Sequence, residues 1–338
     1  MNEQTRDGSG GLSATDIFNS AVAATAIGAA WEVGGLDELH EREALDVAEF
    51  AARNELDATA TTAMFRALAA VGIVRREGGR VTKGPGFAEA YEAKQFFYWL
   101  CQGSWELFGN MPFVLRHKNR SGAFYRRDAK AISHASREAN RKYFDPLFWE
   151  VLESLDFAFA SVTDLGSGSG ERLIQIGRRY PAVRGLGLDV ETASVEMAAL
   201  AVEGSGMADR ISFACADVRA IEPRPEFADV ELLTCFMMGH DLWPKEDCVE
   251  SLRRLRRAFP RARRFLLGDT VRTTGIADAE LPIFTLGFEV GHALMDVYVP
   301  TRAEWHEVFE AGGWRCLTEH VNDRLAGTVV FELESVKS

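Results

Sequence analysis

Three glycines, Gly166, Gly168 and Gly170, alternate with small residues shortly after Asp164. Because glycine has no Cβ, this spacing lets the backbone turn tightly and lets a ligand come close to it. Asp189 follows about twenty residues later, at the end of another apolar run, where a carboxylate can accept hydrogen bonds from two ribose hydroxyls. The pattern predicts a site for a cofactor that contains a nucleoside.

The glycine spacing also bears on which cofactor is bound. Dinucleotide-binding turns read G-x-G-x-x-G and place a pyrophosphate on a helix N-terminus, whereas this turn reads D-x-G-x-G-x-G. S-Adenosylmethionine has no phosphate, so the turn need only admit its amino-acid end and its sulfonium. Asp164 would lie near the ammonium group, and Asp217, which ends the predicted strand 210–217, would meet the adenine amine. We therefore predict S-adenosylmethionine rather than NAD, bound by Asp164, Gly166, Gly168, Gly170, Asp189 and Asp217.

A second group of reactive side chains, His240 and Asp241, follows the fourth predicted strand. In an open α/β sheet the carboxyl ends of the strands face the ligand crevice, so these side chains should lie near a methyl acceptor. Plant-type small-molecule O-methyltransferases place a histidine base here in the sequence HDW, and this chain is similar, with Leu242 inserted before Trp243. From the residues alone, His240 could be a general base, a metal ligand or a loop histidine bonded to a neighbouring carboxylate.

A further histidine, His292, lies in the segment 281–300, with Glu289 three residues earlier on the same side if the segment is helical. Two histidines so far apart in the sequence cannot be paired by spacing. A metal site made by His240 and His292 is therefore one hypothesis, and ordinary core or surface histidines are the other.

The elements that must position these residues follow an α/β pattern. Apolar runs alternate with stretches of helical periodicity, which indicates parallel strands joined by crossover helices. The last two runs are separated by a short loop and predict a hairpin at the sheet edge. This is the layout of class I methyltransferases, a Rossmann-like, mostly parallel, seven-stranded sheet with an antiparallel edge hairpin. The predicted strands are 161–165, 183–190, 210–217, 230–238, 263–270, 314–320 and 328–334.

The residues ahead of this sheet are organised differently. Ser13 and Asp16 can form a capping box at the start of a helix, two more helices are predicted at 45–54 and 59–71, and a hairpin at 72–81. Three helices and a hairpin make a winged-helix-like domain. The packed face predicted for the first helix consists of Ile17, Ala21, Ala24, Ile27, Gly28 and Trp31.

The predicted domain organisation has three regions. Residues 1–100 form the mainly helical, winged-helix-like dimerisation domain, and residues 101–150 form connecting helices that contribute to the substrate pocket. Residues 151–338 form the S-adenosylmethionine-binding methyltransferase domain.

The net charge of the chain indicates whether it binds nucleic acid or a small molecule. Winged helices also occur in DNA-binding regulators, so a regulator that senses the cofactor is an alternative class. However, Arg66 is the only basic residue on the helix 59–71, and the chain carries a formal net charge of −12. Binding to phosphates needs a basic face, so we predict a small-molecule substrate and no nucleic acid.

Length and composition are those of a two-domain enzyme. The chain has 338 residues, and 47% of them are hydrophobic, which is enough for sizeable cores. The five cysteines are scattered without CxxC spacing and predict free thiols in a reducing compartment. The N-terminal residues lack the pattern of a secretion signal, and no run of 18 apolar residues occurs. We therefore expect a cytoplasmic protein that does not bind membranes.

Five segments together resemble one family over essentially the whole chain. They look like the bacterial S-adenosylmethionine-dependent 2-oxo-acid C-methyltransferases of nonribosomal-peptide biosynthesis, and most closely like phenylpyruvate C3-methyltransferases. The resemblance implies an enzyme that is dimeric through its N-terminal region and methylates C3 of a 2-oxo acid in antibiotic biosynthesis. The segments are DIFNSAVAATAIGAAWEVGGLDEL, DLGSGSGERLIQIGRRYP, LLTCFMMGHDLWP, RRFLLGDTVRT and LPIFTLGFEVGH.

The resemblance also implies roles for individual residues. The family carries a catalytic iron or similar transition metal, such as zinc, held by two histidines, and the matching positions are His240 and His292. Asp241 and Arg127 match positions that the family uses around the 2-oxo acid. The two matching positions in the pocket wall are Trp99 and Met237.

This chemistry suits two histidines with an otherwise open coordination sphere. A 2-oxo acid can chelate an ion through its carboxylate and ketone oxygens, which makes the C3 proton easier to remove. Asp241 could orient His240 or assist the removal of the proton, and Arg127 would grip the substrate carboxylate. The alternative function is a metal-free O-methyltransferase in which His240 deprotonates a hydroxyl.

Overall fold

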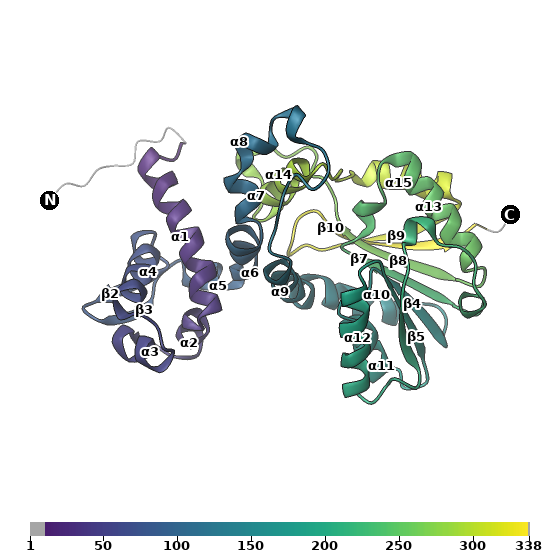
Figure 1. Cartoon of the computed structure of the whole chain (residues 1–338), viewed down its shortest axis with the longest axis horizontal. Coiled ribbons are helices and arrows are strands. Elements are labelled where there is room, and N and C mark those ends of the chain that lie inside the picture. Colours follow the sequence, from purple (N-terminus) through teal and green to yellow (C-terminus); the bar gives the residue numbers. More distant parts are fainter. Residues whose placement is uncertain (1–10, 337–338) are drawn as a thin grey trace. The chain divides into compact units, whose positions relative to one another are not determined.

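The computed structural model describes residues 11–336, which divide into two compact units, one ending at Ala139 and the other beginning at Asn140 (Figure 1). The first is mainly helical and the second is built on a large sheet. None of the helices in this described range is both long and apolar enough to cross a membrane.

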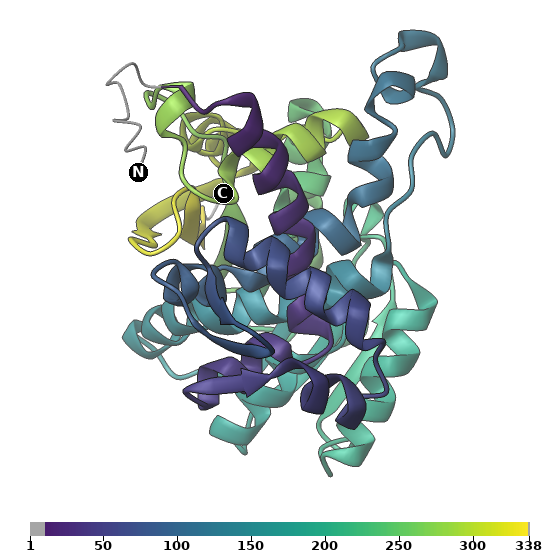
Figure 2. The same ribbon diagram turned by 90° about the vertical axis from the view of Figure 1, so that its left-hand side faces the viewer.

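The first unit opens with helix α1 (Ala14–Glu32). The predicted capping box is confirmed, because Ser13 Oγ accepts from the Asp16 N–H at 3.1 Å and the Asp16 carboxylate accepts from the Ser13 N–H at 3.2 Å. The prediction for the packed face was wrong in part. Ile27 and Trp31 are buried, but Ile17 is 57% exposed, because α4 and α6 pack along α1 without covering its first turns (Figure 2).

Two helices and a hairpin follow as the sequence predicts. A short three-stranded antiparallel sheet in the order β1-β3-β2 completes the winged-helix-like arrangement, and Gly78 turns the hairpin with φ +62°. A glycine fits this left-handed conformation at no steric cost. The elements are α2 (Gly35–Glu41), β1 (Ala44–Asp46), α3 (Val47–Arg53), α4 (Ala58–Ala70), β2 (Val74–Glu77) and β3 (Arg80–Lys83).

The rest of the first unit is a series of short helices. A π-helical turn, Trp99–Gly103, continues directly from α6 and packs against α9. Helical segments of this kind are frequently found at functional sites, which makes Trp99 notable. The elements are α5 (Phe87–Glu92), α6 (Lys94–Tyr98), α7 (Trp105–Gly109), α8 (Met111–Val114), a 3-10 turn (His117–Asn119) and α9 (Ala129–Ala139).

The second unit contains the seven-stranded sheet, in the order β6-β5-β4-β7-β8-β10-β9. The strands from β6 to β8 are parallel, and β10 lies antiparallel between β8 and β9. The predicted class I methyltransferase topology, including its edge hairpin, is confirmed. The strands are β4 (Ser161–Leu165), β5 (Arg184–Asp189), β6 (Ile211–Cys215), β7 (Leu232–Phe236), β8 (Arg264–Thr270), β9 (Trp314–Val321) and β10 (Thr328–Ser335).

Helices cover both faces of this sheet. One apolar core contains residues of α10 and α11 with Leu232 of β7, and the other contains residues of α13 and α15 with the adjacent Leu233. Neighbouring residues of one strand point to opposite faces, so β7 contributes to both cores. The helices are α10 (Asp145–Ser154), α11 (Glu171–Arg179), α12 (Thr192–Gly204), α13 (Lys245–Ala258), α14 (Thr285–Met295) and α15 (Arg302–Gly312), and the shorter turns are Asn140–Phe144, Val218–Ala220, Pro225–Phe227, Gly239–Leu242 and Asp278–Glu280.

Candidate active site

The glycine turn between β4 and α11 has the conformation that its sequence predicts. All three glycines have positive φ, at +69° for Gly166, +50° for Gly168 and +73° for Gly170. A Cβ at Gly166 would lie 2.9 Å from Cγ of Met238, so a side chain there would also collide with the pocket wall. The turn therefore brings bare backbone to the carboxyl edge of the sheet.

Asp189 is fixed to this turn from the end of β5. Its Oδ2 accepts from the Gly168 N–H at 2.8 Å, and its Oδ1 accepts from the Glu191 N–H at 2.9 Å. A carboxylate has about four acceptor positions, so each oxygen keeps one for a further donor. Asp189 thus keeps acceptor positions for further donors while it holds the glycine turn.

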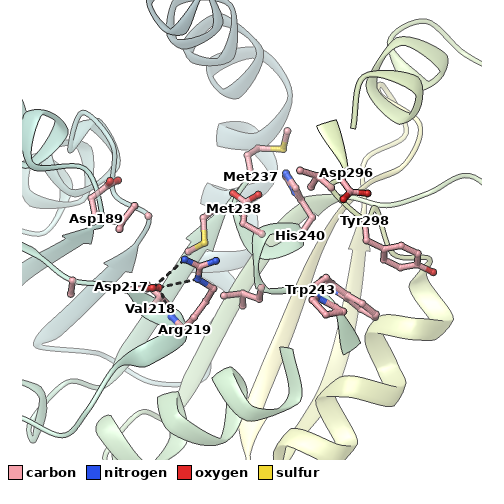
Figure 3. Close-up of a pocket in the computed structure, with 17 residues that line it drawn as sticks. Asp189, Asp217, Val218, Arg219, Met237, Met238, His240, Trp243, Asp296 and Tyr298 are labelled. Carbon is pink, nitrogen blue, oxygen red and sulfur yellow. Dashed lines mark hydrogen bonds and ion pairs between the residues drawn. The ribbon is translucent and has the colours of Figure 1, made fainter. Parts of the chain in front are cut away.

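Asp217, just beyond β6, is paired with Arg219, a partner that was not predicted from the sequence. The Arg219 guanidinium donates to both oxygens of Asp217 at 3.1 Å, and the Arg219 N–H donates at 2.9 Å (Figure 3). The side-chain hydrogen bond from Arg219 lowers the pKa of Asp217. Asp217 is therefore an anion whose position is fixed by the next turn of its own loop.

Gly166, Asp189 and Asp217 line a pocket of about 670 Å³ at the carboxyl edge of the sheet, entirely within the second unit (Figure 3). Its volume suits a nucleoside-sized ligand together with a small second molecule. The predicted site residues that line it are Gly166, Asp189, Asp217, Met237, His240 and Asp241.

Asp164 lies outside the lining of that pocket, buried at the end of β4. The Thr234 hydroxyl donates to its Oδ1 at 2.5 Å. Burial raises the pKa of Asp164, whereas the positive charge of Arg172 and the hydrogen bond from Thr234 lower it.

His240 is held by a buried carboxylate. Asp269, fully buried near the end of β8, accepts from Nδ1 of His240 at 2.8 Å through Oδ1 and from its backbone N–H at 2.7 Å through Oδ2. Asp269 is not among the residues predicted from the sequence, although its place near the carboxyl end of a predicted strand could have identified it. A carboxylate on Nδ1 makes Nε2 the nitrogen through which the ring would accept a proton or bind a metal.

His292 lies beside His240. The centroids of the two imidazoles are 5.0 Å apart, the rings are nearly perpendicular at 86°, and both side chains are buried. Nδ1 of His292 lies 2.7 Å from the Phe288 carbonyl oxygen, which can only accept, so Nδ1 carries the proton. Glu289 turns elsewhere and accepts from the Thr273 N–H at 2.7 Å.

The two histidines can contribute two nitrogen ligands to an ion. Within residues 11–336, no group of three histidine, cysteine, aspartate or glutamate side chains could hold a metal. The remaining ligands of an ion bound here would have to come from a bound molecule or water.

Comparison with known proteins assigns the family. Residues 162–260 match the profile of a methyltransferase domain. Over 327 residues, 94% of this chain and 96% of the relative, the sequence is 49% identical to methyltransferase ungE' of Aspergillus campestris (strain IBT 28561). The chain belongs to the S-adenosylmethionine-dependent methyltransferases. The predicted cofactor S-adenosylmethionine is thus confirmed.

Two other known proteins are less similar to this methyltransferase in sequence. It is 32% identical to the indolepyruvate C-methyltransferase of Streptomyces griseus, over 56% of each chain. Its fold matches the structure of mitomycin 7-O-methyltransferase MmcR with a TM-score of 0.70 and 19% identity, over 95% of this chain and 96% of that one.

Two residues of the methyltransferase pocket have unusual backbone conformations. Met237, directly after β7, has φ +56°, and Asp296, which ends α14, has φ +65°. Non-glycine residues in this left-handed region are uncommon and concentrate at functional sites. Asp296 lines the same pocket as His240 and is not among the residues predicted from the sequence (Figure 3).

Two of the predicted substrate residues of the methyltransferase belong to the first unit. Trp99 is buried at the start of the π-helical turn, and Arg127 is half-buried in the loop before α9. Their contact with the substrate stays a prediction.

Proposed function

We propose that this methyltransferase transfers the methyl group of S-adenosylmethionine to C3 of an aryl 2-oxo acid such as phenylpyruvate. The observation that carries the proposal is the meeting of His240 and His292, two buried imidazoles whose centroids lie 5.0 Å apart at the cofactor edge of the sheet. The similarity to a relative named indolepyruvate C-methyltransferase supports the same class of substrate. The product would be a β-methylated precursor for secondary metabolism.

The arrangement of the two rings fits a metal ion held by His240 and His292. Each Nδ1 is hydrogen-bonded, one to Asp269 and the other to the Phe288 carbonyl. Both rings are thereby fixed in orientation with Nε2 as the coordinating nitrogen, and a carboxylate behind a histidine ligand is a common support for such a site. Iron, zinc and other transition ions accept two imidazoles with oxygen ligands. Such an ion would withdraw electrons from the ketone and carboxylate of the substrate and so acidify C3.

The residues of the chain supply the remaining steps. A pocket carboxylate, Asp241 or Asp296, accepts the C3 proton, and the electron pair of the broken C–H bond passes into the enolate. C3 then bonds to the methyl carbon, while the electrons of the methyl–sulfur bond stay on sulfur and S-adenosylhomocysteine leaves. Holding C3 about 3–3.5 Å from the methyl group can supply a large part of the rate enhancement.

The proposed substrate residues are Arg127, Trp99 and Met237. Arg127 would bind the substrate carboxylate through two parallel hydrogen bonds. Trp99 and Met237 are the proposed contacts of an aromatic ring. The π-helical turn that begins at Trp99 and the left-handed backbone of Met237 support special roles for both residues.

The first unit is proposed to form a homodimer. The N-terminal half of α1 and the residues before it expose large apolar side chains, with Leu12 at 73%, Phe18 at 71% and Val22 at 48%. A contiguous apolar surface of this kind is typical of an interface. Replacing Phe18 by Glu should convert a dimer into a monomer in sedimentation velocity, and an already monomeric wild-type protein would contradict the proposal.

One observation also favours a second function. The His240–Asp269 pair is a suitable general base, because the carboxylate orients the imidazole and stabilises its protonated form. With that base alone the enzyme would methylate a phenol or another hydroxyl without a metal. His292 would then have no chemical role.

The test measures metal content and activity together. Protein without an affinity tag would be analysed for metals, and methyl transfer to phenylpyruvate would be followed before chelation, after it and after return of the metal. The proposal predicts about one ion per chain and activity that disappears and returns with it. Full activity of the metal-free protein on a hydroxyl acceptor would favour the second function.

A further inference from the structure

Arg219 and Asp217 lie side by side in the wall of the cofactor pocket (Figure 3). The guanidinium forms a fork on the carboxylate, in which Nε donates to Oδ1 and Nη2 donates to Oδ2, both at 3.1 Å. The Arg219 N–H also donates to Oδ1, at 2.9 Å, because Asp217 caps the 3-10 turn Val218–Ala220. Asp217 therefore accepts three hydrogen bonds from one residue.

Neither stability nor charge state accounts for this fork. The side chains of Arg219 and Asp217 are 58% and 39% exposed, and exposed ion pairs contribute little to the free energy of unfolding. The hydrogen bond from Arg219 lowers the pKa of Asp217, but an ordinary aspartate, with a pKa of about 3.9, is already ionised at pH 7. The property that the fork does change is the direction in which the carboxylate points.

The fork fixes the plane of the Asp217 carboxylate. The capping N–H holds Oδ1 alone, so without the guanidinium the group could still turn about its bond to Cβ. In the structure Oδ1 has accepted twice, which uses both of its lone pairs, and Oδ2 has accepted once. The carboxylate therefore offers a ligand one acceptor position, on Oδ2, in a fixed direction.

This acceptor lies where the base of the cofactor is expected. Asp189 at the end of β5 is paired in parallel register with Cys215 of β6, and Asp217 follows Cys215 by two residues. The carboxylates predicted to meet the ribose and the adenine amine thus stand on adjacent chain segments. Val190 and Val218, the next residue after each aspartate, line the same pocket and offer apolar surface to a purine ring.

A single fixed acceptor distinguishes one purine from another. The 6-amino group of adenine donates, whereas guanine and hypoxanthine carry a carbonyl oxygen at this position, which only accepts. A carboxylate oxygen held in place forms a charge-assisted hydrogen bond with the amine and repels the carbonyl. A carboxylate that can turn away discriminates less, because it avoids the repulsion.

We propose that Arg219 is a positioning residue for selection of the base, because its fork aims Oδ2 of Asp217 at the 6-amino group of the cofactor adenine. This inference deepens the cofactor part of the proposed function and rests on the predicted contact between Asp217 and the adenine amine. It does not depend on which acceptor is methylated or on a metal.

The test compares two ligands by calorimetry at pH 7. S-Adenosylhomocysteine has the 6-amino group, whereas S-inosylhomocysteine has a carbonyl oxygen in its place. The wild type should prefer the adenosyl ligand about a hundredfold, and Arg219→Met should reduce this preference to about tenfold. An unchanged preference would overturn the inference. Equal losses for both ligands would also overturn it, since they indicate that Arg219 only packs against the base.

A double-mutant cycle tests whether Arg219 acts through Asp217. Asp217→Ala should remove the preference for the adenosyl ligand, and adding Arg219→Met to it should cause little further change. Additive losses would contradict an action through Asp217. Arg219→Lys keeps the positive charge but loses the planar fork, so it should resemble Arg219→Met. A full preference in the Lys variant would overturn the inference, because charge alone would then suffice.

The same measurements separate failure of the inference from failure of the proposed function. A wild type without any preference would show that Asp217 does not meet the adenine amine, and the predicted contact and the inference would fail together. A preference that requires Asp217 but not Arg219 would overturn the inference alone. Neither ligand carries a transferable methyl group, so the result is independent of C-methylation.

Arg224 provides a matched control in the same unit. It lies two residues from its partner Glu226, as Arg219 does from Asp217, and its Nη1 is 3.9 Å from Oε1 of Glu226. Both side chains are exposed, and neither is among the residues that line the cofactor pocket. Arg224→Met should leave both affinities unchanged. A changed ratio in this control would show that the preference follows the loss of a surface charge and would count against the inference.

Discussion

Asp269 accepts hydrogen bonds from His240 twice, at 2.8 Å from the ring Nδ1 and at 2.7 Å from the backbone N–H. One buried carboxylate thereby sets the position, the tautomer and the orientation of the imidazole. Whichever chemistry His240 performs, this pair presents Nε2 as its working atom.

Replacing Asp269 by Asn should lower both activity and stability. The amide has about the same shape but cannot accept both N–H groups through charged oxygens, so we expect kcat/KM to fall about 10–100-fold. Loss of a satisfied buried acceptor should cost about 1–3 kcal/mol in the free energy of unfolding. Steady-state kinetics and urea unfolding measure the two effects, and unchanged kinetics would contradict the role of Asp269.

Removing the imidazole of His292 separates the two candidate functions. In the C-methylation proposal, His292→Ala removes a ligand of the ion. Losing several kcal/mol of transition-state stabilisation by the ion corresponds to a fall in turnover of about a thousandfold. S-Adenosylmethionine affinity should stay nearly constant, because His292 does not line the cofactor pocket. His306, a surface histidine paired with Glu319, provides a control whose alanine variant should keep full turnover. An active His292→Ala enzyme would favour the metal-free function.

Asp296 should show opposite effects on stability and activity. Glycine relieves the left-handed strain at φ +65°, so Asp296→Gly should raise the stability by up to about 1 kcal/mol while it removes a pocket carboxylate. We expect a higher melting temperature together with slower enzyme-catalysed exchange of the C3 proton of phenylpyruvate in D2O. Glu55 in the first unit has φ +56°, and Glu55→Gly should stabilise the protein with no effect on exchange. Undiminished exchange in the Asp296 variant would assign proton removal to another group.

The Glu304 carboxylate predicts a distinct acid response. Burial would raise its pKa, but hydrogen bonds from Tyr298 and Thr301 and the charge of Arg272 lower it to about 2. A carboxyl group with a lowered pKa in the folded state stabilises the fold above its unfolded pKa of about 4.3, and this contribution disappears as the pH falls towards 2. Glu304→Gln should therefore destabilise the protein at pH 7 and have less effect as the pH decreases. A difference in stability that stays constant from pH 7 to pH 3 would contradict this origin.

The sheet and the positions of Asp189 and Asp217 at its edge could be predicted because both depend on local patterns. Buried parallel strands appear as continuous apolar runs, and Asp189 and Asp217 stand directly at or after the strand ends. The face of α1 was predicted less well, since periodicity identifies an apolar stripe but not which neighbouring helix covers it. Ile17 is exposed for that reason.

The remainder of the site depends on tertiary structure. His240 and His292 meet only because α14 returns to the carboxyl edge of the sheet, and no spacing rule connects them. Arg219 pairs with Asp217 through side-chain orientation within one turn, which the sequence does not specify. The left-handed conformation of Asp296 likewise follows from how α14 ends.

The most direct test of the proposed function is the structure of the product. The enzyme would be incubated with phenylpyruvate and S-adenosylmethionine labelled with ¹³C in the transferred methyl group, and the product examined by NMR. A methyl carbon coupled to the proton on C3 is the predicted result. A methyl resonance of an ether, or transfer only to added phenols, would contradict C-methylation and assign the enzyme to the O-methyltransferases.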